Sequence, residues 1–220
     1  MVNSGVFAQM FEEAGINGED LAIFAGIMVV YFAFLGVISL VMYLLNAFGL
    51  YGMAKGSGIS APWRGFIPFA NTFLFGKIAE RYVKKDGKKS AKFGGLLLAF
   101  EILTLVFAAA VVVFSIGMLA VLFGCINNAG EIETAIGYTL IPMFFSALAL
   151  MGVSITYIVL YYVALWRIFT AFDYNNATLY FVLTIFFSFL GPIFLFVLRN
   201  KKPVFDTREH FKYYFNDTQQ

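Results

Sequence analysis

Four stretches of the sequence contain no charged residue, and they constrain the fold more than any other feature. They cover residues 21–54, 102–130, 134–166 and 174–198, and each is 25 to 34 residues long. A helix needs about 20 apolar residues to cross the hydrocarbon core of a bilayer, so each stretch is long enough to cross once. Helices of soluble proteins average about 11–12 residues and keep a polar face, and strands of a membrane barrel alternate in polarity. The stretches therefore predict an all-α integral membrane protein.

The composition agrees with a membrane protein, since 61% of the residues are apolar and only 13% are charged. Soluble domains carry about 25% charged residues. We expect one membrane domain over residues 1–220, with four transmembrane helices at about 21–47, 95–123, 137–166 and 177–198. No lysine or arginine precedes the first of them, and its apolar run exceeds the 7–15 residues of a signal peptide, so we expect it to remain as a span.

Lysine and arginine residues are concentrated in two parts of the chain. Nine lie in the segment 55–92 and five in the tail 199–220, which we expect to be amphipathic, whereas the first 20 residues contain none. The positive-inside rule places the segment 55–92 in the cytoplasm and the N-terminus outside. Four full spans would then place the basic tail outside, against the same rule. A last segment that turned back at Gly191-Pro192 without crossing would place the tail inside, and the sequence leaves both arrangements open.

The segment 55–92 predicts an amphipathic interfacial helix between the first two spans. Apolar and basic residues recur there at spacings of three and four, so they lie on opposite faces of a helix. The basic face consists of Lys77, Arg81, Lys84, Lys85 and Lys88. Such a helix suits the headgroup layer, where each cation contributes about 1 kcal/mol near anionic lipids. Enforcement of topology by these charges and binding to a partner protein are alternatives.

Several short motifs resemble a family of small uncharacterised multi-pass bacterial membrane proteins. The clearest is a Trp-x-x-Phe-Ile-Pro-x-x-Asn element over residues 63–71, after the first span, and the likeness continues at 140–142, 166–177 and 187–196. The chain departs from the family at Ala70, where the family often has tyrosine, and in a charged insertion at 84–92. The resemblance implies a bacterial plasma (inner) membrane protein, and it brings no established activity.

A few polar or aromatic residues near the expected spans are candidates for a function. Glu101 lies in the second span, close to Lys92 and the expected interface, so we expect an interfacial or paired role. Transport or proton relay is the alternative, because an ionisable group inside a membrane points to such a function. Trp63 and Arg64 fit the role of interface anchors. Asn71 follows Pro68 by three residues and can cap the backbone groups that the helix break releases.

Arg167 and Asp173 flank a short step between the third and fourth spans, and their spacing allows an ion pair. Exposed pairs of this kind contribute little stability, so we expect a local role for them.

The sequence contains no catalytic template, whether a Walker loop, a nucleophile elbow or a zinc-protease motif, and no metal-ligand spacing. No catalytic, cofactor-binding or metal-binding residue is therefore predicted. We expect a non-enzymatic multi-pass membrane protein that is scaffolding, regulatory or accessory to an envelope complex. Its partners would be the lipid bilayer, including anionic lipids, and another membrane protein or further copies of itself; a net charge of +2 gives no reason to expect nucleic acid.

Two other functions fit the same pattern. Breaks at Pro68, Pro142 and Gly191-Pro192 suggest a small transporter or lipid-handling protein that acts as an oligomer, because discontinuous helices often line transport sites. A membrane enzyme is the second alternative, and it would need clustered polar groups that the sequence does not display.

Overall fold

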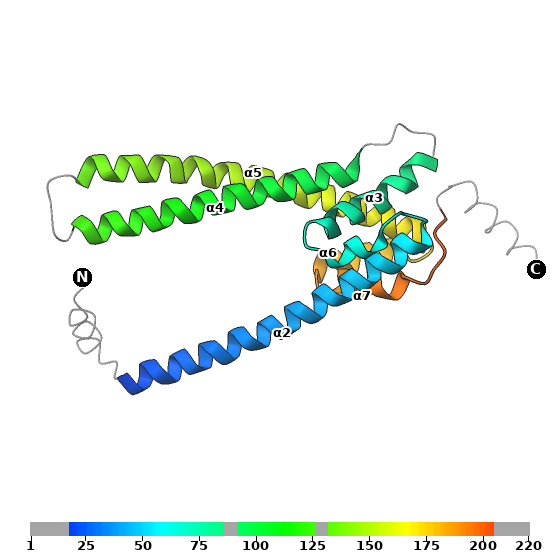
Figure 1. The fold of residues 1–220 in the computed structure, drawn as a ribbon, viewed down its shortest axis with the longest axis horizontal. Helices are drawn as coiled ribbons and strands as arrows, with labels where there is room; N and C mark the ends of the chain where they lie inside the picture. Colours follow the sequence, from blue (N-terminus) through cyan, green and yellow to red (C-terminus); the bar gives the residue numbers. More distant parts are fainter. Residues whose placement is uncertain (1–17, 86–91, 126–131, 205–220) are drawn as a thin grey trace, which may run out of the picture. The chain divides into compact units, whose positions relative to one another are not determined.

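The computed structural model describes residues 18–85, 92–125 and 132–204, and every regular element in them is a helix. The helices are α2 (Gly18–Gly56), the 3-10 helix η1 (Pro62–Phe66), α3 (Ala70–Lys85), α4 (Phe93–Cys125), α5 (Ile132–Phe172), α6 (Ala177–Phe186) and α7 (Leu190–Leu198) (Figure 1). The expected all-α class is confirmed.

Three of these helices are long and apolar enough to cross a membrane. The apolar stretches are Ala22–Gly56 in α2, Phe93–Leu119 in α4 and Tyr138–Phe172 in α5. Charge exclusion therefore identified three helices that are long and apolar enough to span a membrane, although α2 continues well past the expected end at residue 47. It ends where Gly58 adopts a positive φ of 64°, a conformation that glycine adopts without steric cost.

The chain divides into two compact units, residues 1–44 and residues 45–220. The described part of the first unit is the N-terminal part of α2, and every residue from 22 to 41 is exposed. The second unit contains the end of α2 and all later helices.

The fourth expected span is not a single helix, so the count of four spans is not confirmed. α6 has 10 residues and α7 has 9, each about half of what a crossing needs. The chain leaves the helical conformation at Phe187 (φ −129°, ψ 81°), a few residues before the expected break. Pro192 lies in the first turn of α7, where its missing N–H removes no intrahelical bond.

The two short helices form an antiparallel hairpin. The rings of Tyr180 and Phe194 lie 4.8 Å apart, and a Cβ on Gly191 would lie 3.2 Å from the methyl carbon of Thr184. The first half of α6 thus contacts the middle of α7, and the end of α6 lies against the beginning of α7.

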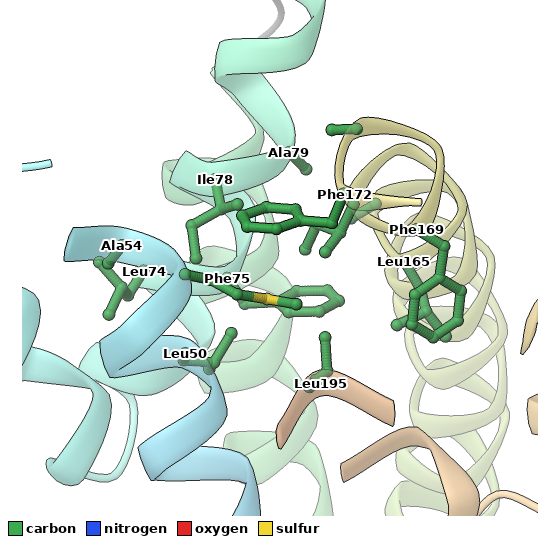
Figure 2. Close-up of a cluster of buried hydrophobic side chains, with 14 of the residues drawn as sticks. Leu50, Ala54, Leu74, Phe75, Ile78, Ala79, Leu165, Phe169, Phe172 and Leu195 are labelled. Carbon is green, nitrogen blue, oxygen red and sulfur yellow. The ribbon is translucent and has the colours of Figure 1, made fainter. Parts of the chain in front are cut away.

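A buried apolar core connects the helices of the second unit (Figure 2). Its members include Leu50, Ala54, Leu74, Phe75, Ile78, Ala79, Leu165, Phe169, Phe172 and Leu195. The Phe75 ring stacks on the ring of Tyr161 at 4.9 Å, which joins α3 to α5.

α3 has an apolar face and a charged face, and the apolar face packs in the protein core. Leu74, Phe75, Ile78 and Ala79 are at most 3% exposed, and they belong to one buried core with residues of α2, α4, α5 and α7. The interfacial position expected for this helix is therefore not confirmed.

Candidate functional site

The connection between α2 and α3 folds back along the end of α2. Gly65 in η1 lies against α2, where an added Cβ would be 3.1 Å from the carbonyl oxygen of Ala47, and the ring of Phe66 lies 5.0 Å from that of Phe48. Trp63 and Arg64 in η1 are exposed, as anchors must be, while their depth in a membrane stays a prediction.

Two residues that flank η1 hold left-handed backbone conformations without being glycine. Ala61 has φ 60° and precedes Pro62, and Phe69 has φ 65° and follows Pro68. This conformation costs about 1–2 kcal/mol for an L-residue, so the packing around η1 must hold it in place.

Asn71 ties α3 to α2. Its side chain is 8% exposed, and its Oδ1 accepts a hydrogen bond from Nδ2 of Asn46 at 3.4 Å. The backbone cap suggested for Asn71 stays a prediction. Asn46 was not among the expected residues, because its contact depends on the chain folding back after α2.

Part of the basic face of α3 contacts other residues of the protein. Arg81 donates to the carbonyl oxygens of Ser57 and of Gly58, the latter at 2.9 Å, and so satisfies acceptors at the end of α2. The Lys77 ammonium lies 4.8 Å from the centre of the Phe73 ring. Lys84 and Lys85 belong to α3, but their side chains and the whole of Lys88 lie outside the described residues.

Glu101 lies about two turns into α4 and is half-buried. Its Oε2 atom is buried and has no hydrogen-bond partner in the described part of the chain, while Thr72 of α3 and Tyr157 of α5 are close neighbours. No cation pairs with Glu101 among the described residues, so its paired role and its transport role both stay predictions.

The expected pair of Arg167 and Asp173 is not formed. Asp173 instead pairs with Lys201, and Asn176 and Tyr180 donate to its Oδ2 at 3.2 and 3.3 Å. Burial raises the pKa of the Asp173 carboxyl, but the hydrogen bonds from Lys201 and Asn176 and the charge of Lys201 outweigh it, so the pKa lies below its ordinary value.

Arg167 contacts an aromatic ring instead of a carboxylate. Its guanidinium carbon lies 4.2 Å from the centre of the Phe93 ring, and its Nη1 is buried with no acceptor within the described segments. Phe93 begins α4, so this contact joins the beginning of α4 to the last part of α5.

The residues after α7 return to the same end of the molecule as the C-termini of α2 and α5. The backbone N–H of Val204 donates to the carbonyl oxygen of Ala171 at 2.8 Å, and a Cβ on Gly52 would lie 2.8 Å from Cβ of Arg199. We call the cations gathered there the basic end. It consists of Lys55, Arg81, Arg199, Lys201 and Lys202.

Sequence reasoning placed Arg81 in a functional motif but not the other four residues of the basic end. The only signal was the spacing of Gly49, Gly52 and Gly56 along one side of α2, where α7 and the residues after it pack.

The described residues define an all-helical protein with three helices of membrane-spanning length and apolarity. No protein-family model, curated protein or solved structure matches the chain. Within the described residues, no group of three or more His, Cys, Asp or Glu could hold a metal ion.

Proposed function

We propose that this chain is a bacterial plasma-membrane protein without enzymatic activity, which serves as a scaffolding or accessory subunit of an envelope complex. The observation that carries the proposal is that the described part of the unit 1–44, taken by itself, is a single apolar helix whose residues 22 to 41 are exposed. Ala22 and Gly26 lie four residues apart there, and small residues at that spacing allow a second membrane helix to approach closely. The occupant we propose is a helix of another membrane protein.

Site-specific photo-crosslinking in native membranes tests this function. A benzoylphenylalanine at Val30 of α2, which is 69% exposed, should give one discrete protein adduct. The same group at Val113 of α4, which is 64% exposed, is the matched control and should give none. The protein found in the adduct should also co-purify with the unmodified chain in mild detergent. A clean monomer without adducts at Val30 would contradict the proposal.

We further propose that the chain crosses the membrane three times and that the α6–α7 hairpin enters and leaves on one side. The contacts of Lys201 with Asp173 and of Val204 with Ala171 support this arrangement, because they bring the residues after α7 back to the end of α5. The positive-inside rule then puts the basic end in the cytoplasm and the N-terminus outside.

The native cysteine makes the topology directly testable. Cys125 ends α4 and is the only cysteine, so in right-side-out vesicles it should react with a membrane-impermeant maleimide. In a Cys125→Ser background, Lys202→Cys should react only after permeabilisation, and Lys55→Cys is the matched control for the inner side. Labelling of Lys202→Cys from outside would establish four crossings instead.

A small transporter or lipid-handling protein is the second candidate. Glu101 favours it, because its buried Oε2 has no hydrogen-bond partner among the described residues. Glu101→Gln keeps the shape of the side chain and removes its charge. Loss of an uptake or lipid-distribution phenotype in this variant, at normal protein level, would favour transport over scaffolding.

A further inference from the structure

Arg199 is held in a defined place where α7 ends. It is the C-terminal cap residue of α7, and its side chain lies against α2, since a Cβ on Gly52 would come within 2.8 Å of its Cβ and 3.3 Å of its Cγ. The guanidinium carbon lies 3.6 Å from the centre of the Phe196 ring. Packing on both sides therefore fixes the position of the charge.

The guanidinium of Arg199 has a donor that the described residues leave unused. Its Nη1 is buried without an acceptor in them. Arginine does not lose its proton in proteins, and a buried donor without an acceptor is costly. Stacking on an aromatic ring leaves the N–H groups in the plane of the guanidinium, and Arg199 as a whole is half-buried, so N–H groups other than that of Nη1 can meet the oxygens of a phosphate. A charged group held in this way favours an anion as its partner.

The charges around Arg199 also favour an anion. Lys55 and Lys202 are exposed, and Lys55 precedes Gly56, where an added Cβ would lie 3.9 Å from Cδ of Pro203. Asp173 is the only acidic residue between positions 172 and 204, and it is engaged by Lys201. Lys55 and Lys202 thus lie on the chain segments next to Arg199, and we call these three cations the cationic cluster.

The place of this cluster on the chain identifies the source of the anion. Arg199 directly follows the apolar helix α7, and Lys55 directly follows the uncharged stretch of α2. Charges at such positions lie at the level of the lipid headgroups, where basic pockets between membrane helices bind anionic headgroups. We propose that Arg199, with Lys55 and Lys202, binds the phosphate of an anionic glycerophospholipid. This inference is independent of the proposed scaffolding function.

Lipid binding by the purified full-length protein tests the site. The probes are phosphatidylglycerol and phosphatidylcholine, each titrated into protein in mild detergent and counted by native mass spectrometry. Arg199→Gln should weaken phosphatidylglycerol binding about tenfold, and Arg199→Lys, which keeps the charge but loses the planar fork, should fall between. Lys92→Gln also removes one positive charge, at an exposed residue that precedes α4, and should change binding less than about twofold.

Three outcomes would overturn the proposal. Equal binding of the two lipids would show that the site does not select an anionic lipid. An equal loss of binding in Lys92→Gln would show general electrostatic attraction. Competition by millimolar inorganic phosphate would identify a free anion as the ligand. If Arg199→Gln does not fold, Lys202→Gln replaces it, because the exposed Lys202 side chain lies outside the buried core; it should weaken binding about threefold, and unchanged binding would again refute the site.

Discussion

A single methyl group added to α4 at one of two neighbouring glycines should have opposite effects on stability. A Cβ on Gly94 would lie 2.9 Å from the carbonyl oxygen of Phe73 and 3.1 Å from Cγ of Lys77, because α3 and α4 pack backbone to backbone there. A Cβ on Gly95 would meet nothing within 4 Å. The facing residue Gly76 is tighter still, since its Cβ would lie 2.6 Å from the Cα of Gly94.

The magnitudes follow from two competing terms. Replacing glycine by alanine inside a helix stabilises it by about 0.5–1 kcal/mol when the methyl group has room. Forcing a methyl group into a packed contact costs about 1–3 kcal/mol, because both helix backbones must move apart. We therefore expect Gly95→Ala to be stabilising by about 0.5–1 kcal/mol, and Gly94→Ala and Gly76→Ala to be destabilising by about 1–2 kcal/mol.

Reversible unfolding of the purified protein in mixed micelles, followed by circular dichroism, measures these free energies. Gly95→Ala is the matched control, because it makes the same change one residue along the same helix. If Gly95→Ala destabilises as much as Gly94→Ala, or if Gly76→Ala is neutral, then α3 and α4 do not pack through these glycines and the reasoning is wrong.

Two further predictions concern the ends of the helices. Ala61→Gly should stabilise the protein by about 1 kcal/mol, because it relieves a left-handed alanine at φ 60°. Ala109→Gly, at an exposed position of α4, should destabilise the protein by a similar amount. Unfolding in micelles measures both, and a loss of stability in Ala61→Gly would contradict the assigned backbone. The depressed pKa of Asp173 means that its pair with Lys201 stabilises the fold above the pKa of an unfolded aspartate, about 3.9, and that this stability is lost as the pH falls through the folded pKa. Asp173→Asn should flatten the dependence of stability on pH in that acidic range. If the dependence is unchanged in this variant, a group other than Asp173 causes it.

The three long apolar helices could be predicted from the sequence, because a bilayer excludes charge and the length of a charge-free stretch is visible without a structure. The surroundings of α3 could not. The spacing of Leu74, Phe75, Ile78 and Ala79 reveals an apolar face, but the same pattern arises whether the face meets lipid or protein. Only the return of the chain along α2 places that face in a core.

The contacts of the candidate residues could not be predicted from the sequence for a related reason. Asp173 and Lys201 are 28 residues apart, and Arg199 meets Gly52 across most of the chain, so neither contact has a local signature. Both exist because α6 and α7 form a hairpin. The predicted pair of Arg167 and Asp173 was based on their proximity along the chain. In the structure, the Lys201 ammonium pairs with Asp173 instead.

A helix break inside an apolar segment is tolerated in a membrane only if the freed backbone N–H and C=O groups find hydrogen-bond partners. The turn between α6 and α7 meets part of that condition with its own atoms. The N–H of Phe187 donates to Leu183 at 2.8 Å, that of Leu190 to Phe187 at 2.9 Å and that of Gly191 to Ser188 at 3.2 Å, while Pro192 has no N–H to satisfy. These bonds lower the penalty that normally forces an apolar stretch to continue as one helix. Under the proposed topology, a crossing by α6 and α7 would instead move Arg199 and the cations after it to the outer side of the membrane, against the positive-inside rule. Both considerations favour a hairpin that returns.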